Sequence, residues 1–249
     1  MRLPMTPPLP PASEVVLDGF GNAPMKALPI PHYLTQVYWW AYVHPRAVRV
    51  FEREWLVNTI LFGNFGRLRD AALAELGSPA QGKTLRVACV YGDLTSRLLQ
   101  RLAPDANLDV VDILPIQLTN LAGKLPVDER VALLQGDSSS LACADADYDQ
   151  VLLFFLLHEQ PETVRRATLA EAMRVVKPGG KVVIVDYHRP RPWHPMRPLM
   201  RLVFRKLEPY AMDMWAHGIE QFLPASTPPA SSHHRTYFGG LYQKLVLTR

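Results

Sequence analysis

The strongest constraint on the fold is a repeated alternation of short apolar runs and helical patterns between Thr84 and His188. The apolar runs are TLRVACV, NLDVVDI, VALLQGD, YDQVLLFFLLHE and KPGGKVVIVDYH. Continuous apolar strands separated by helices are typical of a parallel sheet that helices cover on both faces. The C-terminal stretch RTYFGGLYQKLVLTR has a Gly-Gly turn between two β-rich arms, which predicts an antiparallel pair at the sheet edge. We therefore expect a doubly wound, mostly parallel α/β sheet.

The chain divides into three segments. Residues 1–31 contain eight prolines, which predicts a disordered tail. Residues 32–76 predict an N-terminal helical extension, in which Pro45 starts a second helix and Gly77 closes it. Residues 77–249 then hold the sheet, with 189–223 expected to form lid or membrane-facing helices.

Composition excludes several classes of protein. The longest apolar run, VLLFFLL, is far shorter than the ~20 residues needed to span a bilayer. Two lone cysteines, Cys89 and Cys143, and an N-terminus without a signal-peptide pattern predict an intracellular protein. A formal net charge of +4 indicates an anionic partner only where the charges cluster, and we expect no nucleic-acid partner.

Ligands of such sheets bind at the carboxyl ends of the strands. Of the spaced glycines that let a nucleotide approach the backbone after the first strand, only Gly92 remains in RVACVYGDLT. Asp112 ends the second strand and is either a ribose-binding acid or a helix N-cap before Pro115. Asp137 and Ser138 follow the third strand and would meet an adenine edge or a reacting centre, although Asp137 could equally be a turn residue.

Ionisable side chains also end the fourth and fifth strands. His158 and Glu159 follow the fourth strand, and Asp186 and His188 end the fifth. Neighbouring strand ends therefore carry candidate proton carriers, although a single histidine is more often a hydrogen-bonded structural residue.

The order of these pieces over residues 77–249 resembles the class I methyltransferases that depend on S-adenosylmethionine (SAM), and VVKPGGKVVIVDYH is the most specific match. The resemblance implies a seven-stranded sheet with a reversed last strand. In that family the first strand ends in an acid that three alternating glycines follow. In our alignment Cys89 replaces the acid, and Tyr91, Asp93 and Thr95 replace the glycines.

Three stretches resemble a narrower family, the RquA proteins of rhodoquinone biosynthesis: VYWWAYVHPRAVRVFEREWLVN, VACVYGDLT and FFLLHEQ. The resemblance implies conversion of ubiquinone to rhodoquinone by exchange of a ring methoxy group for an amino group, with SAM as nitrogen source and a manganese ion. It also implies a peripheral position on the cytoplasmic side of a bacterial inner membrane. Two other functions stay open, a SAM-dependent quinone or phenol methyltransferase and a non-catalytic SAM- or quinone-binding assembly module.

Amino transfer would explain the altered loop, because the amine of SAM must reach an electron-poor quinone carbon without its proton. An acid at position 89 would hold the amine protonated, whereas Cys89 would not. Bulky Tyr91 and Thr95 would displace the amino-acid end of SAM. Asp93 would bind the sulfonium or the displaced amine, or it would cap the next helix.

These arguments give a set of candidate site residues. The expected SAM-binding residues are Cys89, Tyr91, Gly92, Asp93, Thr95, Asp112, Ile113, Gln117, Asp137 and Ser138. The expected catalytic residues are Asp137, His158 and Asp186. Asp137, His158 and Glu159 are candidate ligands of a manganese ion that would polarise a quinone oxygen. Tyr38, Trp39, Trp40, His188 and Trp193 are expected to contact the quinone, although core packing is the commoner role of such aromatic residues.

The stretch MRPLMRLVFRKLEP predicts a basic amphipathic helix. Between His188 and Lys206 the sequence has six basic residues and no acid. One helical face carries Arg197, Arg201 and Arg205, and another carries Leu199, Leu202, Val203 and Leu207. With Trp193 nearby, this pattern predicts an element that meets an anionic membrane surface, or else a lid helix with a solvated cationic side.

Overall fold

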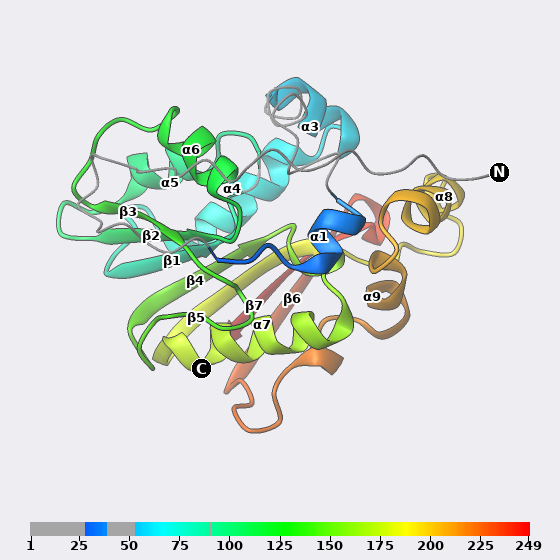
Figure 1. Ribbon diagram of the computed structural model, residues 1–249. Helices are drawn as coiled ribbons and strands as arrows, with labels where there is room; N and C mark the ends of the chain where they lie inside the picture. Colours follow the sequence, from blue (N-terminus) through cyan, green and yellow to red (C-terminus); the bar gives the residue numbers. More distant parts are fainter. Residues whose placement is uncertain (1–27, 39–52, 90) are drawn as a thin grey trace.

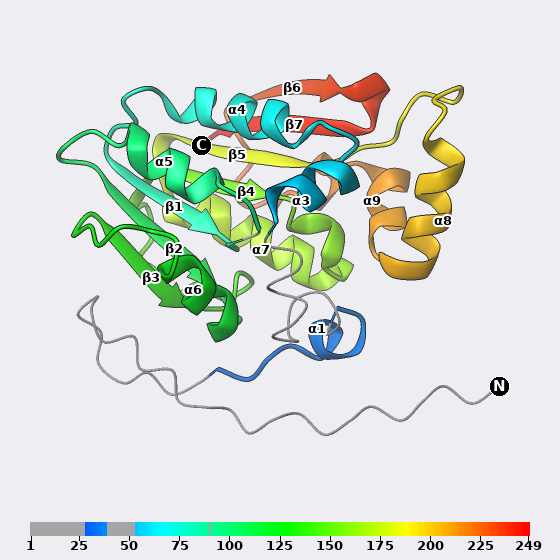
Figure 2. The same cartoon turned by 90° about the horizontal axis from the view of Figure 1, so that it is seen from above.

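The computed structural model describes residues 28–38, 53–89 and 91–249. A seven-stranded sheet with the order β3-β2-β1-β4-β5-β7-β6 runs through these residues (Figures 1 and 2). Its strands are β1 (Lys83–Val87), β2 (Asn107–Asp112), β3 (Val131–Gln135), β4 (Tyr148–Phe154), β5 (Val176–Tyr187), β6 (Ser231–Tyr237) and β7 (Tyr242–Thr248).

Strand direction confirms the expected fold class. The pairs among β1 to β5 are all parallel, and β7 runs antiparallel to both β5 and β6. The 3-10 turn η4 (Phe238–Gly240) joins β6 to β7, as the Gly-Gly turn predicted. A mostly parallel seven-stranded sheet with one reversed strand is the class I methyltransferase fold.

Helices cover both faces of this sheet. The helices of the described residues are α1 (His32–Gln36), α3 (Glu54–Ile60), α4 (Phe65–Leu76), α5 (Leu94–Arg101), α6 (Pro115–Ala122), α7 (Glu162–Val175), α8 (Arg197–Leu207) and α9 (Ala211–His217), with short 3-10 helices η2 (Leu157–Glu159) and η3 (Glu220–Phe222). Both views place α4, α5 and α6 on one face and α7 on the other. Central strand residues such as Val151 and Ile184 are therefore fully buried, which explains the continuous apolar runs.

The N-terminal extension differs from the expected long helix. Phe62 and Gly63 take φ values of 50° and 77°, which interrupt the helical pattern and separate α3 from α4. Gly77 follows the end of α4, as predicted, with φ of 93°. Pro45, the expected start, lies outside the described residues, and so does most of the proline-rich tail.

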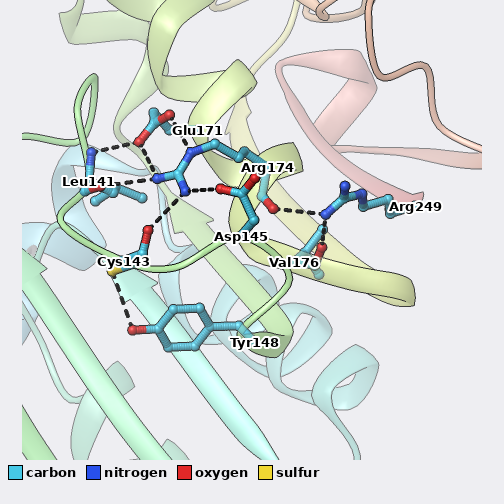
Figure 3. A network of polar contacts seen from close by, with 8 residues as sticks. All are labelled: Leu141, Cys143, Asp145, Tyr148, Glu171, Arg174, Val176 and Arg249. Carbon is cyan, nitrogen blue, oxygen red and sulfur yellow. Dashed lines mark hydrogen bonds and ion pairs between the residues drawn. The ribbon is translucent and has the colours of Figure 1, made fainter.

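Arg174, near the end of α7, fixes the loop that leads from β3 to β4 (Figure 3). Its guanidinium donates hydrogen bonds to the backbone carbonyls of Leu141 and Cys143 and to the carboxylates of Asp145 and Glu171. Arg249 donates to the carbonyl of Arg174 at 2.8 Å. This network therefore stabilises the end of the sheet at which β4 begins. The opposite end, where the parallel strands finish, is free of this network.

Across the described part of the chain, no helix combines the length and the apolar character needed to cross a membrane.

Candidate active site

A pocket lies at the carboxyl ends of β1, β2, β3 and β4. Its lining residues are Val87, Ala88, Cys89, Val111, Asp112, Ile113, Leu114, Gln117, Gly136, Asp137, Ser138, Leu156 and Glu159, together with Pro31, Tyr33 and Leu34 of the N-terminal segment. The strand order reverses between β1 and β4, which is where doubly wound sheets bind their ligands.

The loop after β1 starts earlier than the apolar run suggested. β1 ends at Val87, whereas the run continues to Val90. Ala88 has φ of 65° and Gly92 has φ of 94°, the left-handed values that favour glycine. Asp93, by contrast, has φ of −101°, which any residue adopts. Among the described residues of this loop, the positions that call for glycine are therefore 88 and 92.

This geometry corrects the alignment of the loop by three residues. In the corrected alignment, Arg86 takes the place of the acid at the strand end. Ala88, position 90 and Gly92 take the places of the three alternating glycines, and the pattern no longer starts at Cys89. Arg86 is 1% exposed, so a buried cation occupies the place of the acid. Gly92 is required here, because a Cβ atom would lie 2.5 Å from Cζ of Phe65.

Cys89 and Asp112 form a buried pair in the wall of the pocket. Oδ2 of Asp112 accepts the backbone N–H of Cys89 at 2.8 Å and its thiol at 3.2 Å, and Oδ1 accepts the N–H of Leu114 at 2.9 Å. Burial raises the pKa of the Cys89 thiol, and the Asp112 carboxylate raises it further, so Cys89 stays neutral. Leu114, not Asp112, is the N-cap residue of α6, so the alternative role of Asp112 as a cap is wrong.

The rest of the loop turns away from the pocket. The Tyr91 hydroxyl accepts a hydrogen bond from Gln117 Nε2 at 3.1 Å. Asp93 makes no side-chain cap bond to α5, and its carboxylate pairs with Arg69, at 2.7 Å, and with Arg97. The expected SAM-binding residues that line the pocket are Cys89, Asp112, Ile113, Gln117, Asp137 and Ser138, whereas Tyr91, Gly92, Asp93 and Thr95 are outside its lining.

Asp137 is a turn residue that also lies in the wall of the pocket. Its Oδ1 accepts the backbone N–H of Ser139 at 2.8 Å and the Ser139 hydroxyl at 2.7 Å, so it stabilises the turn after β3. Asp137 also lines the pocket. Ser138 is held more firmly, because its Oγ accepts from Gln160 Nε2 at 3.0 Å and lies 3.0 Å from Thr168 Oγ1.

His158 and Asp186 form a buried ion pair beside the pocket. Nδ1 of His158 lies 2.8 Å from Oδ1 of Asp186, which is fully buried, and Nε2 lies 3.7 Å from Oε1 of Glu159. Burial lowers the pKa of His158, but Asp186, Glu159 and Glu208 raise it more, so that the pKa is about 9. His158 is therefore a cation at neutral pH. Oδ2 of Asp186 also accepts the N–H of Leu157 at 2.9 Å, which ties β5 to η2.

The candidate manganese ligands do not converge. Asp137 and Glu159 both line the pocket, but the His158 ring is held against Asp186. Within residues 28–38, 53–89 and 91–249, no three His, Cys, Asp or Glu side chains are grouped so that they could hold a metal ion. These residues therefore do not fit a manganese site.

Helix α1 covers the pocket, which the sequence did not predict. Tyr33 and Leu34 line the pocket, and Leu34 packs against Leu114. The cavity left beneath α1 has a volume of about 60 Å³, below the roughly 300 Å³ at which ligand pockets begin. The sequence signals this contact only through the apolar residues around Leu34. These residues cannot show that the partner is Leu114, which lies far along the chain.

The residues expected to contact the quinone are dispersed. Tyr38 is buried with Leu34 and Leu114. His188 Nδ1 lies 2.8 Å from the carbonyl oxygen of Gly240, and Trp193 is 72% exposed, so neither reaches the pocket. Trp39 and Trp40 lie outside the described residues.

Sequence comparisons support a SAM-dependent transferase. Residues 84–180 match the family described as a methyltransferase domain. The ubiquinone/menaquinone biosynthesis C-methyltransferase UbiE of Paracoccus denitrificans is 31% identical over 58% of this chain and 58% of that protein. A demethylmenaquinone methyltransferase of Staphylococcus aureus is 28% identical over 67% of this chain and 68% of that protein. The match thus spans less than two thirds of the Paracoccus relative.

Solved structures share the fold at low sequence identity. An O-methyltransferase family protein from Burkholderia thailandensis has a TM-score of 0.63 at 18% identity and covers 82% of this chain and 60% of its own. Human N-acetylserotonin methyltransferase, solved in complex with SAM, has a TM-score of 0.61 at 14% identity and covers 88% of this chain and 62% of its own. These structures therefore show that the chain has the class I methyltransferase fold. Its curated relatives carry the names of quinone methyltransferases.

Proposed function

We propose that this chain is a SAM-dependent transferase that exchanges a ring methoxy group of ubiquinone for an amino group. The observation that carries the proposal is Arg86, which stands at the end of β1 where the resembling methyltransferases have an acid. A carboxylate there would keep the methionyl amine protonated, whereas a nearby cation lowers the pKa of an amine. The charge of Arg86 acts on both Cys89 and Asp112, which line the pocket.

The side chains around the pocket suit the handling of SAM and of a proton. SAM, when bound, supplies the amine that adds to the ring carbon. Asp112 accepts hydrogen bonds from the ribose hydroxyls, and Asp137 faces the adenine or the reacting centre. Glu159 would accept the proton that the amine loses on addition, and the ring carbon would release its methoxy group as methanol. The nitrogen is then still bonded to the Cα atom of SAM. Cleavage of this N–Cα bond, with loss of a proton from Cβ, would free the amino group on the ring and leave an α,β-unsaturated acid. Asp186 orients His158, whose Nε2 lies 3.7 Å from Oε1 of Glu159.

Methylation of a quinone ring carbon is the second candidate, because the Paracoccus relative is named a C-methyltransferase of ubiquinone and menaquinone biosynthesis and the Staphylococcus relative a demethylmenaquinone methyltransferase. It requires the S-methyl group, rather than the amine, to face the ring. The substrate must then be a quinol whose ring carbon is a nucleophile, whereas amination needs an electrophilic quinone.

Product analysis separates these functions. The purified protein would be incubated with short-tail ubiquinone, or with a demethylated quinol, and with SAM that carries heavy nitrogen in its amine and a heavy S-methyl group. Amination predicts an aminoquinone that contains the heavy nitrogen. The reaction would be run in two separate arms, one with added manganese and one without. Transfer of the heavy methyl group would establish methylation instead, and absence of any product in the presence of SAM binding would leave the non-catalytic module.

The role of Arg86 makes a separate prediction about pH. Arg86→Met keeps much of the side-chain volume and removes the charge, and thermal unfolding of the variant checks that it still folds. Without the cation the pKa of the amine rises. The pH profile of amination should therefore move upward by about one unit, with a roughly tenfold lower rate on its acid side. Val127→Ser, at an exposed position before β3, serves as control and should leave the profile in place. Identical profiles of Arg86→Met and the parent protein would contradict the proposal.

A further inference from the structure

Helix α8 presents apolar side chains to solvent. Met200 and Phe204 face the core, being 2% and 0% exposed. Leu199 and Leu202 lie on the other side and are 44% and 57% exposed. Of the four apolar residues on the face that the sequence predicted, Leu199, Leu202 and Leu207 are exposed, whereas Val203 is partly buried against the core. An isolated exposed leucine is ordinary, whereas a row of them on one helix indicates an interaction surface.

Cationic side chains border this row. Arg201, Arg205 and Lys206 are exposed and, among the described residues, have no salt-bridge partner. Arg197 is half-buried instead, so it contributes less than the sequence pattern suggested. Since the stretch 188–207 has no acidic residue, the face formed by Leu199, Leu202 and these three cations is uniformly positive.

Trp193 extends this surface, and a second exposed tryptophan, Trp55, lies on α3. Trp193, in the loop before α8, is 72% exposed and stacks with Arg191, whose Cζ lies 5.6 Å from the ring centroid. Trp55 is 62% exposed on α3, a helix without a buried residue. Ring contacts of Phe238 with Phe62, at 6.1 Å, and with His194, at 5.1 Å, join the end of α3 to the loop that holds Trp193.

The inner side of α8 leads to the candidate active site. Phe204 contacts Tyr187 at 4.9 Å between ring centroids, and Tyr187 contacts the His158 ring at 4.7 Å. Two aromatic side chains, Phe204 and Tyr187, would thus connect α8 and a partner on its outer face to His158.

We propose that the outer face of α8, together with Trp193, docks the protein on an anionic lipid bilayer. The exposed leucines enter the acyl boundary, Trp193 occupies the interface, and Arg201, Arg205 and Lys206 meet the lipid phosphates. Charge complementarity selects an anionic bilayer, and the leucine row requires an apolar phase beneath the charges. This inference goes beyond the proposed reaction and stands without it.

Flotation of the full chain with vesicles tests the proposal. Vesicles of phosphatidylcholine mixed with phosphatidylglycerol should bind the protein, whereas phosphatidylcholine alone should bind it weakly. Each cation near an anionic surface contributes about 1 kcal/mol, so Arg201→Gln, Arg205→Gln and Lys206→Gln together should lower the partition coefficient roughly 100-fold. Leu199→Ser with Leu202→Ser should lower it on both vesicle types, roughly tenfold or more.

Matched controls lie far from this face. Lys181→Gln removes an exposed cation at the opposite end of β5, and Val127→Ser removes an 87% exposed apolar side chain before β3. Both should bind vesicles as the parent does, and thermal unfolding of every variant checks the fold. Equal flotation of the α8 variants and the parent would overturn the proposal, as would a change of parent oligomeric state that the α8 variants abolish without any vesicle binding. Neither outcome depends on amination.

Discussion

At the scale of single residues, His158 shows how burial and charge act against each other. A buried imidazole alone would be neutral, yet the Asp186 carboxylate at 2.8 Å keeps it charged and moves its pKa from 6.5 to about 9. The same carboxylate accepts the backbone N–H groups of Leu157 and Tyr187, so its own position is fixed. The pair therefore links protonation of one ring to the geometry of the strand ends.

The raised pKa of His158 predicts a pH-dependent stability. A group whose pKa is higher in the folded state stabilises fully below its unfolded pKa, here 6.5, and loses that contribution as pH rises through about 9. The free energy of unfolding should therefore fall by about 3 kcal/mol across this window. His158→Gln should flatten the fall, whereas His233→Gln, at an exposed position, should not. Urea denaturation over a pH series measures both, and parallel curves for His158→Gln and the parent would show that the pair does not act in this way.

At the scale of elements, Arg165 of α7 joins three pieces of chain. It is fully buried, and its guanidinium donates to the carbonyl oxygens of Leu157, Gln160 and Tyr210, each at 2.9 Å. It also pairs with Asp213 of α9 at 2.8 Å. The Arg165 guanidinium thus connects α7 to η2 and to the region that leads into α9. It stabilises the turn that carries His158.

Loss of Arg165 should therefore destabilise the fold strongly. Arg165→Met leaves buried carbonyl oxygens without a donor, and breaking such a buried network typically costs about 3–5 kcal/mol. The neighbouring Arg166 is exposed and pairs with Glu162, so Arg166→Met should cost about 1 kcal/mol or less. Chemical denaturation compares the two variants. A similar small loss in both would mean that these elements are held by other contacts.

The sequence predicted elements better than it predicted their ends and distant contacts. Apolar runs identified the strands, and Pro115 marked the start of α6, because these signals are local. The end of β1 was missed, since an apolar run cannot reveal that Ala88 takes a positive φ. Asp112, Asp137 and Glu159 were found because parallel strand ends meet at one edge of a sheet. Leu34 was not found, because its contact is made across a long stretch of chain.

At the scale of the whole molecule, α1 closes the carboxyl edge of the sheet from one side to the other. Leu34 and Tyr38 pack against Leu114 at the start of α6. Tyr33 meets Tyr210, near the start of α9, edge-on at 6.3 Å between ring centroids. A short helix of five residues has little stability of its own, so tertiary packing holds it in place. The hollow beside α1 that Tyr33, Asp137 and Tyr210 line has a volume of about 420 Å³, larger than the space beneath the helix. We therefore expect α1 to move when a ligand as large as SAM enters the space beneath it.

Weakening the attachment of α1 should consequently change the rates of SAM binding. Leu34→Ser removes about 2 kcal/mol of apolar burial at a residue that is 6% exposed. Opening of α1 then becomes more frequent in the free protein and in the complex, so both the association and the dissociation rate constants should rise roughly tenfold or more. The dissociation constant should change much less than either rate. Stopped-flow fluorescence with SAM measures the rates, and Val127→Ser, at an exposed loop position, should leave them unchanged. Unchanged rates in Leu34→Ser, with a fold that melts as the parent does, would mean that SAM enters without passing α1.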